Sequence, residues 1–309
     1  MIHDTRTHFK STTFSNFKKS KVLKQLENCM YYQKKEEAFY WTGELVCSGY
    51  VLELWNLFFY VMCKYIHIHN PRLPLYLEKK FNEFKSIANE QSNDLELRNL
   101  PEIRTILFSV TLLLCESKRD MILEDLHFAF KFENIFTNLK APNVDYIKPY
   151  FKEGDPKEIY IPLNECAYHL IETKNRMDIF FWIDWMIQFD ESCTKQKKTL
   201  SCVPREFVTV KSTNMIWILF ELLLSFEEPV ILHKVLHSLM NLFSIKYTPS
   251  TNKKKKYILN LCVSLIIHDA VDFSTKLIEN TSVFSPIQEN INLIFEQIKK
   301  NEINEILND

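Results

Sequence analysis

KKEEAFYWTGELVCSGYVLELWNLFFYVMCKYIHIHNPRLP, residues 34–74, is the stretch that decides the fold. Apolar side chains recur there at helical spacing on both sides of Gly49, which predicts one helix over 36–48 and another over 51–69. Pro71 ends the second helix, because the residue before a proline avoids the helical region. Two helices joined by so short a link lie antiparallel, so the stretch predicts a helical hairpin.

Helical periodicity continues along most of the chain and predicts about thirteen helices. Only Phe207–Val210 has the pattern of a strand, which is too little to seed a sheet. The predicted fold is all-α: antiparallel helix hairpins in two lobes, arranged as an irregular stack of the HEAT or armadillo kind or as paired bundles. The other helices are expected at 17–31, 73–89, 102–117, 120–139, 163–173, 176–189, 213–226, 229–245, 255–268, 271–279 and 287–307.

Glycine is scarce, with only 3 in 309 residues, where average usage of about 7% would give roughly twenty. Glycine supplies positive φ in tight turns and lets a backbone approach phosphates closely. Its scarcity argues against hairpin-rich sheets, dinucleotide-binding crossovers and phosphate-binding loops, and the chain has no GxxxxGKS/T, GxGxxG, HExxH or GxSxG motif. These absences argue against most familiar enzyme classes, so we expect a protein that is not an enzyme, with no catalytic residue, no cofactor and no metal. An enzyme with an unfamiliar helical site, metal-dependent in one version, stays open as an alternative.

Prolines gather near the middle of the chain. Of the 11 prolines, those at positions 142, 149, 156 and 162 lie within 141–162, together with one of the 3 glycines. Such a composition is typical of a linker between compact parts. The sequence therefore predicts an N-terminal helical lobe over 1–140, a proline-rich connector over 141–162 and a C-terminal helical lobe over 163–309.

The densest set of distinctive side chains lies on one face of the first helix of the hairpin. Glu37, Trp41, Glu44 and Ser48 follow at spacings of four, three and four, and Trp55 lies on the next helix. Glutamate is rarely buried without a partner, so two carboxylates around a tryptophan predict a groove that binds a basic or helical segment of a protein partner. In the alternative interpretation, these glutamates pair with nearby basic residues and hold adjacent helices in register.

Three lysine runs lie near expected links between helices. Loop lysines can contact phosphate through charge alone, which predicts salt-sensitive binding to a nucleic-acid backbone. The runs contain no interleaved arginine or aromatic residue, so solvated linkers are the alternative interpretation. The runs are Lys18, Lys19 and Lys21; Lys195, Lys197 and Lys198; and Lys253, Lys254, Lys255 and Lys256.

Two further groups of residues raise the question of chemistry. His233 and His237 are spaced i, i+4, which places two imidazoles on one helix face, but a metal would need further ligands from elsewhere. Glu165, Cys166 and His169 form a second group, although a Cys–His nucleophile pair normally comes from separate elements. Packing is the favoured interpretation of both groups.

The eight cysteines are scattered singly, several of them within apolar helical segments. This distribution is typical of reduced, buried thiols and indicates a reducing compartment. The first residues contain no apolar run, so we expect no signal peptide, and no apolar stretch reaches the roughly 18 residues of a membrane span. The expected location is the cytoplasm.

One region of the chain resembles a segment of uncharacterised all-helical proteins of large eukaryotic (nucleocytoplasmic) DNA viruses. The resemblance covers about residues 30–85, and a composition rich in lysine, asparagine and isoleucine fits an AT-rich genome. It implies a virus-encoded protein of the host cytoplasm and carries over no functional residue. The residues that carry it are the run EAFYWTGELVCSG over 37–49, followed by Leu54, Trp55, Lys64, His67, Asn70, Pro71, Leu73 and Pro74.

Taken together, the sequence predicts a non-enzymatic helical scaffold for protein–protein interaction. The alternative from another class is an accessory factor that binds nucleic acid through its lysine runs. A structural role inside a virus particle also stays open as an alternative. Near-equal numbers of basic and acidic residues, 38 and 39, argue against a surface wholly devoted to nucleic acid but leave room for a local basic patch.

Overall fold

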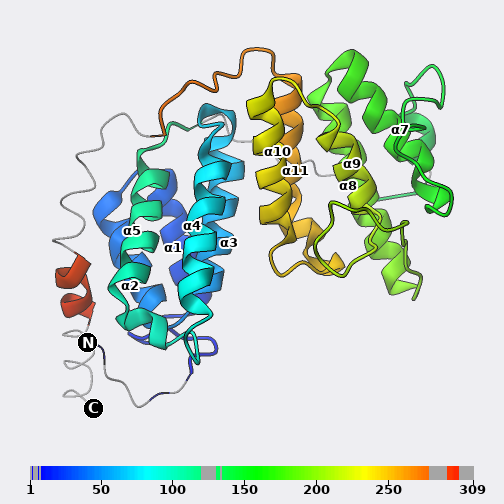
Figure 1. Ribbon diagram of the computed structural model, residues 1–309. Coiled ribbons are helices and arrows are strands. Elements are labelled where there is room, and N and C mark those ends of the chain that lie inside the picture. Colours follow the sequence, from blue (N-terminus) through cyan, green and yellow to red (C-terminus); the bar gives the residue numbers. More distant parts are fainter. Residues whose placement is uncertain are drawn as a thin grey trace. The chain divides into compact units, whose positions relative to one another are not determined.

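The computed structural model describes residues 2, 6, 8–119, 130–132, 134–277 and 291–298. Helices make up the regular structure of these residues, with two isolated bridges and no strand, which confirms the predicted all-α fold. The chain divides into two compact units (Figure 1). Unit 1 comprises Met1–Met121 and Ser274–Asp309, and unit 2 comprises Ile122–Phe273.

Unit 1 is built from five α-helices of the N-terminal half and a helical stretch at 291–298. A π-helical turn and a 3-10 turn extend α3, and a 3-10 turn precedes α5. Prolines stand in the first turns of α4 and α5, where the missing N–H costs nothing. The elements are α1 (Lys19–Tyr31), α2 (Lys35–Cys47), α3 (Val51–Val61), η1 (Met62–Ile66), η2 (His67–His69), α4 (Leu73–Ala88), η3 (Glu96–Asn99) and α5 (Pro101–Glu116).

The core of unit 1 is aromatic between α3 and α4. Trp55 is 1% exposed, and its ring centroid lies 5.3 to 5.8 Å from those of Phe58, Phe59, Phe81 and Phe84. Aromatic pairs at these separations stabilise a core beyond their area burial. These four phenylalanines and the tryptophan are all buried, so the packing of α3 against α4 is aromatic.

The 291–298 helix belongs to unit 1, although it is far from the other helices in sequence. Its Phe295 ring lies 6.0 Å from that of Phe108 and 3.9 Å from the guanidinium carbon of Arg104. A Cβ at Gly43 would come within 2.9 Å of Ile298, so glycine permits this close approach to α2.

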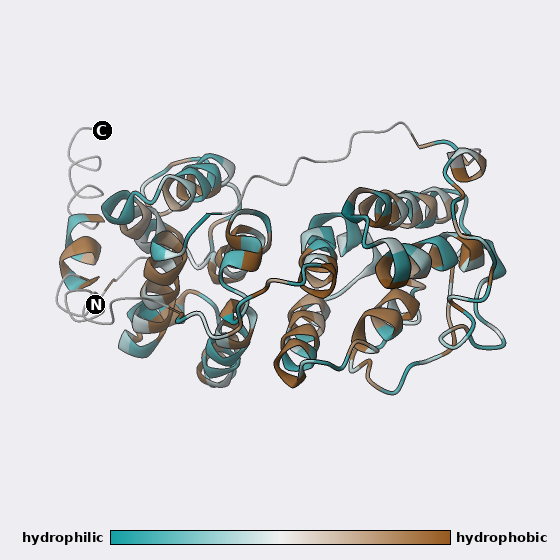
Figure 2. Ribbon diagram, turned by 90° about the horizontal axis from the view of Figure 1, so that it is seen from above, coloured by the Kyte–Doolittle hydropathy of each residue, from teal (hydrophilic) through white to brown (hydrophobic). Residues whose placement is uncertain are grey.

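Unit 2 contains the remaining α-helices. Figure 2 shows polar and apolar residues separated along these helices, as expected for helices that bury one face. In the core, Trp217, Phe220 and Phe243 bring α9 and α10 together with ring centroids 4.9 to 5.9 Å apart. The elements are α6 (Asn134–Thr137), η4 (Lys157–Ile159), α7 (Tyr160–Tyr168), η5 (His169–Thr173), α8 (Arg176–Lys195), α9 (Ile216–Leu224), α10 (Val230–Ser244), η6 (Pro249–Thr251) and α11 (Asn252–Ile267).

The proline-rich stretch 141–162 lies wholly inside unit 2, whereas the sequence predicted a connector there. The stretch is bonded to the rest of the unit: the amide oxygen of Asn164 accepts the backbone N–H of Tyr146 at 3.0 Å, and the carboxylate of Asp155 accepts two bonds from Arg205. Prolines ended the helical pattern here as predicted, but polar side chains from later in the chain hold the turns in place.

The helix expected at 287–307 is helical over 291–298, and the rest of it lies outside the described residues. Two other expected helices differ from the structure. The helix expected at 120–139 is helical only at Asn134–Thr137 among its described residues, since 120–129 and 133 lie outside them. The helix expected at 271–279 is absent over 271–277, which form turns and bends. Asp, Ser and Thr side chains in that segment favour local turns over helix. Within the described residues, no helix combines the length and apolar character needed to cross a bilayer.

Candidate functional site

The predicted partner stripe of α2 is largely covered by the chain's own N-terminal segment. Glu44 is fully buried, and its carboxylate accepts the backbone N–H of Ser15 at 2.7 Å and the hydroxyl of Ser15 at 2.9 Å. Ser48 is 3% exposed and accepts the N–H of Phe14 at 2.8 Å. Because these groups satisfy one another, the occupant of this part of the stripe is residues 14–15 of the same chain.

The other residues of the stripe have different environments. Trp55 belongs to the core described above. Trp41 is half-buried under Phe17, with ring centroids 5.5 Å apart. Glu37 is exposed and pairs with Lys34 at 3.3 Å. Only Glu37 and Trp41 therefore present surface that an outside partner can reach.

The lysine runs of unit 2 divide into exposed and engaged side chains. In the run at the start of α11, Lys253 and Lys254 are exposed. Lys255 donates to the carbonyl of Phe243 at 2.7 Å and also to that of Ile245, at the end of α10. Lys256 contacts both carboxylate oxygens of Asp184 at 3.1 Å. The run of four lysines thus contributes its first two charges to the surface.

The two lysine runs of unit 2 lie at the same end of it (Figure 1). A buried polar node joins the segments: Asn214 donates to Asp190 of α8 at 2.9 Å and accepts from Asn252 of α11 at 3.2 Å. Across the surface, Lys253 of α11 lies 3.9 Å from Glu191 of α8. We call this region the lysine-rich end; its exposed lysines are Lys195, Lys197, Lys198, Lys211, Lys246, Lys253 and Lys254.

The third run lies in unit 1, where Lys18 and Lys21 are exposed. Lys19 is engaged with the protein, since its amine lies 2.9 Å from Glu53 and over the ring of Tyr50.

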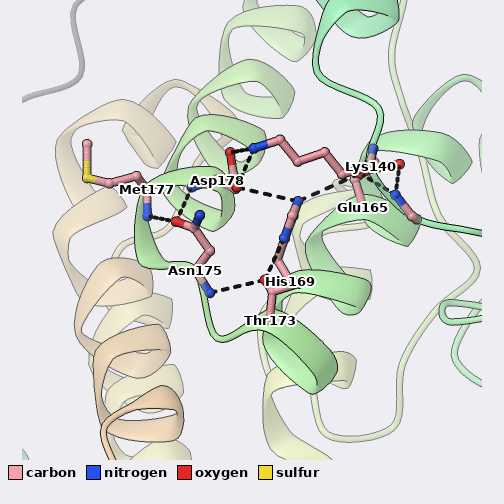
Figure 3. A network of polar contacts seen from close by, with 8 residues as sticks. Lys140, Glu165, His169, Thr173, Asn175, Met177 and Asp178 are labelled. Atoms are coloured by element: carbon pink, nitrogen blue, oxygen red, sulfur yellow. Dashed lines mark hydrogen bonds and ion pairs between the residues drawn. The ribbon is translucent and has the colours of Figure 1, made fainter.

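A polar network surrounds His169, one of the residues singled out in the sequence (Figure 3). Its Nδ1 lies 2.8 Å from the hydroxyl of Thr173, and its Nε2 lies 3.8 Å from carboxylate oxygens of Glu165 and Asp178. Lys140 bridges to both oxygens of Asp178 at 2.7 and 2.8 Å. The network therefore ties the residue that precedes the proline-rich stretch to α7 and α8.

The remaining bonds of the network fix the backbone. The carboxylate of Glu165 accepts the N–H groups of Lys140 and Ala141 at 2.9 and 3.0 Å. Asn175 caps α8 by accepting the N–H groups of Met177 and Asp178.

The environment of His169 argues for a structural role of this network. The imidazole is 1% exposed, and burial lowers its pKa below 6.5 against the opposing effect of Asp178 and Glu165. The neighbouring Cys166 is fully buried, and burial raises the pKa of its thiol. A thiol held neutral in an apolar environment is a poor nucleophile. The network is best described as a clamp on the 140–141 backbone.

The histidine pair of α10 is in contact. Nε2 of His233 lies 3.1 Å from Nε2 of His237, so the i, i+4 spacing does bring the rings together. In the part of the chain that the structure describes, no three His, Cys, Asp or Glu side chains are grouped as metal ligands. The pair on its own supplies two nitrogen ligands.

One candidate surface was missed by the sequence predictions. Phe132, Phe136, Leu139 and Val144 have exposed fractions of 47%, 70%, 47% and 51%. We call these four residues the apolar strip. The first three follow at i, i+4 and i+7, the spacing of a helical face, and they lie in the stretch where the sequence predicted a helix over 120–139; among the described residues of that stretch only Asn134–Thr137 are helical.

The apolar strip has an ordered base. The ring of Phe132 lies 5.9 Å from that of Trp185 and 5.8 Å from that of Phe189, both on α8. At the other end, the Lys140–Asp178 pair follows Leu139 directly. Phe132 and Lys140 are therefore two points at which the segment that carries the strip contacts α8.

No protein-family profile, no curated protein and no solved structure matches this chain.

Proposed function

We propose that the protein is a non-enzymatic helical scaffold that binds a protein partner through the apolar strip of unit 2. The observation that carries the proposal is the exposure of Phe136, at 70%, between Phe132 and Leu139 on one segment. Clustered exposed apolar side chains mark interaction sites on soluble proteins more often than single ones do.

The base of the strip supports this role. The contact of Phe132 with Trp185 and the His169 clamp on residues 140–141 restrict this segment at two points before binding, which lowers the entropic cost of association. Aromatic side chains with ordered surroundings are the residues that contribute most at interfaces. Glu37 and Trp41 of unit 1 form a second, smaller contact in this proposal, with Glu44, Ser48 and Trp55 supporting the helices beneath.

We also propose that the protein acts in the cytoplasm, and in the host cytoplasm if it is virus-encoded as the resemblance implies. The support is that all eight cysteines are buried thiols. Buried unpaired thiols are typical of proteins that fold in reducing compartments.

The test is direct binding to a purified partner, identified first by affinity purification of the full chain and mass spectrometry. Phe136→Ser with Leu139→Ser removes the exposed apolar area of the strip and should weaken binding of that partner by tenfold or more, since one buried aromatic anchor is worth about 2 kcal/mol or more.

Val230→Ser is the matched control, because Val230 is an apolar residue of unit 2 that is 58% exposed but belongs to α10. It should leave the affinity unchanged, and both variants should keep the circular dichroism of the wild type. Equal affinity of the strip variant and the wild type would contradict the proposal.

A further inference from the structure

The lysine-rich end of unit 2 collects charge from four separate segments. The end of α8 contributes Lys195, Lys197 and Lys198, and the 199–215 loop contributes Lys211. The link after α10 contributes Lys246, and the first turn of α11 contributes Lys253 and Lys254. The sequence shows only the first and last of these as runs, so the fold enlarges the patch.

The four segments are held together by bonds beneath the lysines. Asn214 joins the loop to Asp190 of α8 and to Asn252 of α11, at 2.9 and 3.2 Å. Lys255 joins the first turn of α11 to the carbonyls at the end of α10. The exposed lysines are therefore fixed on one base before any ligand arrives.

Few negative charges oppose these lysines. Within the same segments, the carboxylates that reach the surface are Glu191 and Glu206, while Asp190 is 5% exposed. The contact of Lys253 with Glu191, at 3.9 Å, is long and solvent-exposed, and such pairs contribute little. Glu158 of η4 also lies near this end, since its charge acts on Cys193 of α8. The seven exposed lysines still outnumber the surface carboxylates, so the lysine-rich end is positive on a chain whose formal net charge is −1.

We propose that the lysine-rich end binds the phosphate backbone of a nucleic acid without reading its bases. Lysine ammonium groups contact phosphates as point charges, whereas base reading favours the planar fork of arginine. The arginine of these segments, Arg205, has a fully buried side chain that is bonded to Asp155 and Glu221. This inference goes beyond the scaffold proposal and stands independently of it.

The surface also distinguishes a nucleic acid from other anionic partners. No large apolar residue of segments 190–214 and 244–256 is among the exposed ones. Membrane-surface sites add apolar side chains that enter the bilayer interface, and peptide sites add aromatic anchors. A patch of lysines alone fits a ligand whose surface is a regular array of phosphates.

The test is a salt titration of binding between the full chain and short labelled DNA and RNA of unrelated sequences, from about 50 to about 200 mM salt. We expect similar affinities for these sequences and a steep fall with salt. Each lysine that no longer contacts a phosphate leaves about one more counterion bound to the nucleic acid, so the plot of log affinity against log salt becomes less steep by about 1. The steepness should therefore fall by about 2 in K253Q/K254Q and by about 3 in K195Q/K197Q/K198Q.

K79Q/K85Q is the matched control, because it removes two exposed lysines of α4 in unit 1. It should leave both slope and affinity unchanged, and all variants should retain the wild-type circular dichroism. The proposal is overturned if the control lowers the slope as much as K253Q/K254Q does, or if neither lysine-rich variant changes it. It is equally overturned if polyglutamate or vesicles of anionic lipid bind as tightly as nucleic acid with the same dependence on these lysines.

Discussion

Lys255 shows how a charged residue can serve the fold at a cost in stability. Its amine caps the end of α10 by donating to carbonyls that have no partner within that helix. Burial lowers its pKa from 10.5 to about 8. The folded protein therefore holds a buried ammonium at neutral pH.

The first prediction concerns the pH dependence of this cost. Below pH 8 the lysine is charged in both folded and unfolded chains. Between pH 8 and 10.5 the folded chain releases the proton while the unfolded chain keeps it, so the free energy of unfolding rises with pH. The rise should reach roughly 3 kcal/mol relative to Lys255→Met.

The measurement is urea unfolding of wild type and Lys255→Met from neutral to alkaline pH. Tyrosines and cysteines titrate in both proteins, so their contributions to the unfolding free energy cancel when the two proteins are compared. A difference in unfolding free energy that does not change with pH would show that Lys255 keeps an ordinary pKa in the folded protein.

The second prediction concerns the contribution of Glu44 to the stability of unit 1. Glu44→Ala removes the acceptor of two bonds from Ser15 and leaves a cavity, which should lower the free energy of unfolding by about 2–4 kcal/mol. Trp41→Ala, at a half-buried position on the same helix, should cost less. Thermal unfolding followed by circular dichroism compares them. Undiminished stability of Glu44→Ala would mean that the carboxylate is free for an outside partner.

At the scale of elements, Arg205 holds the proline-rich stretch against α9. Its guanidinium makes two bonds to Asp155, at 2.6 and 2.7 Å, and one to Glu221 at 2.7 Å. Burial acts to raise the pKa of Asp155, but bonds from Arg205 and from the amides of Lys152 and Val203 outweigh it, so the pKa lies below 3.8. Asp155 is therefore a buried carboxylate that needs its partner.

We predict that Arg205→Gln releases this stretch. An unpaired buried carboxylate costs about 3–5 kcal/mol, so unit 2 should lose stability and trypsin should cleave rapidly after Lys152, within the released stretch. Arg176→Gln removes an exposed arginine of α8 and should leave the cleavage rate unchanged. Identical digestion of the two variants would contradict the role given to Arg205.

Helices were predictable wherever their signals were local. The proline before α4 and the one that begins α5, together with apolar periodicity, located these helices to within a few residues. The extent of the 120–139 helix and the place of 141–162 depended on tertiary contacts instead. Asn164 and Arg205, which hold the stretch in unit 2, lie outside it in sequence, so no local pattern shows the connection.

The candidate sites were predictable in part for the same reason. The spacing of the α2 stripe was right, but its occupant, Ser15, lies 29 residues away from Glu44. The convergence of two lysine runs also required the fold. The helical periodicity of α11 could have distinguished Lys255 from the exposed lysines of its run. Ile258 and Leu259 are buried, and Lys255 lies one helical turn before them on the same face.

At the scale of the whole molecule, the two units differ in how the chain builds them. Unit 2 is one continuous stretch, Ile122–Phe273, whereas unit 1 needs two stretches. A fragment of residues 122–273 should therefore fold alone, with a helical circular dichroism spectrum and a cooperative thermal transition. Truncation of the chain after residue 290 should destabilise unit 1, because the contacts of Phe295 with Phe108 and Arg104 are lost. A non-cooperative 122–273 fragment would contradict the division.

The central claim is that a protein partner binds the apolar strip. Cross-linking of the purified complex with a lysine-reactive reagent, followed by mass spectrometry, tests it most directly. Lys131 and Lys140 are exposed and flank Phe132, Phe136 and Leu139. The account predicts that cross-links to the partner concentrate on these two lysines; cross-links confined to lysines of unit 1 would contradict it.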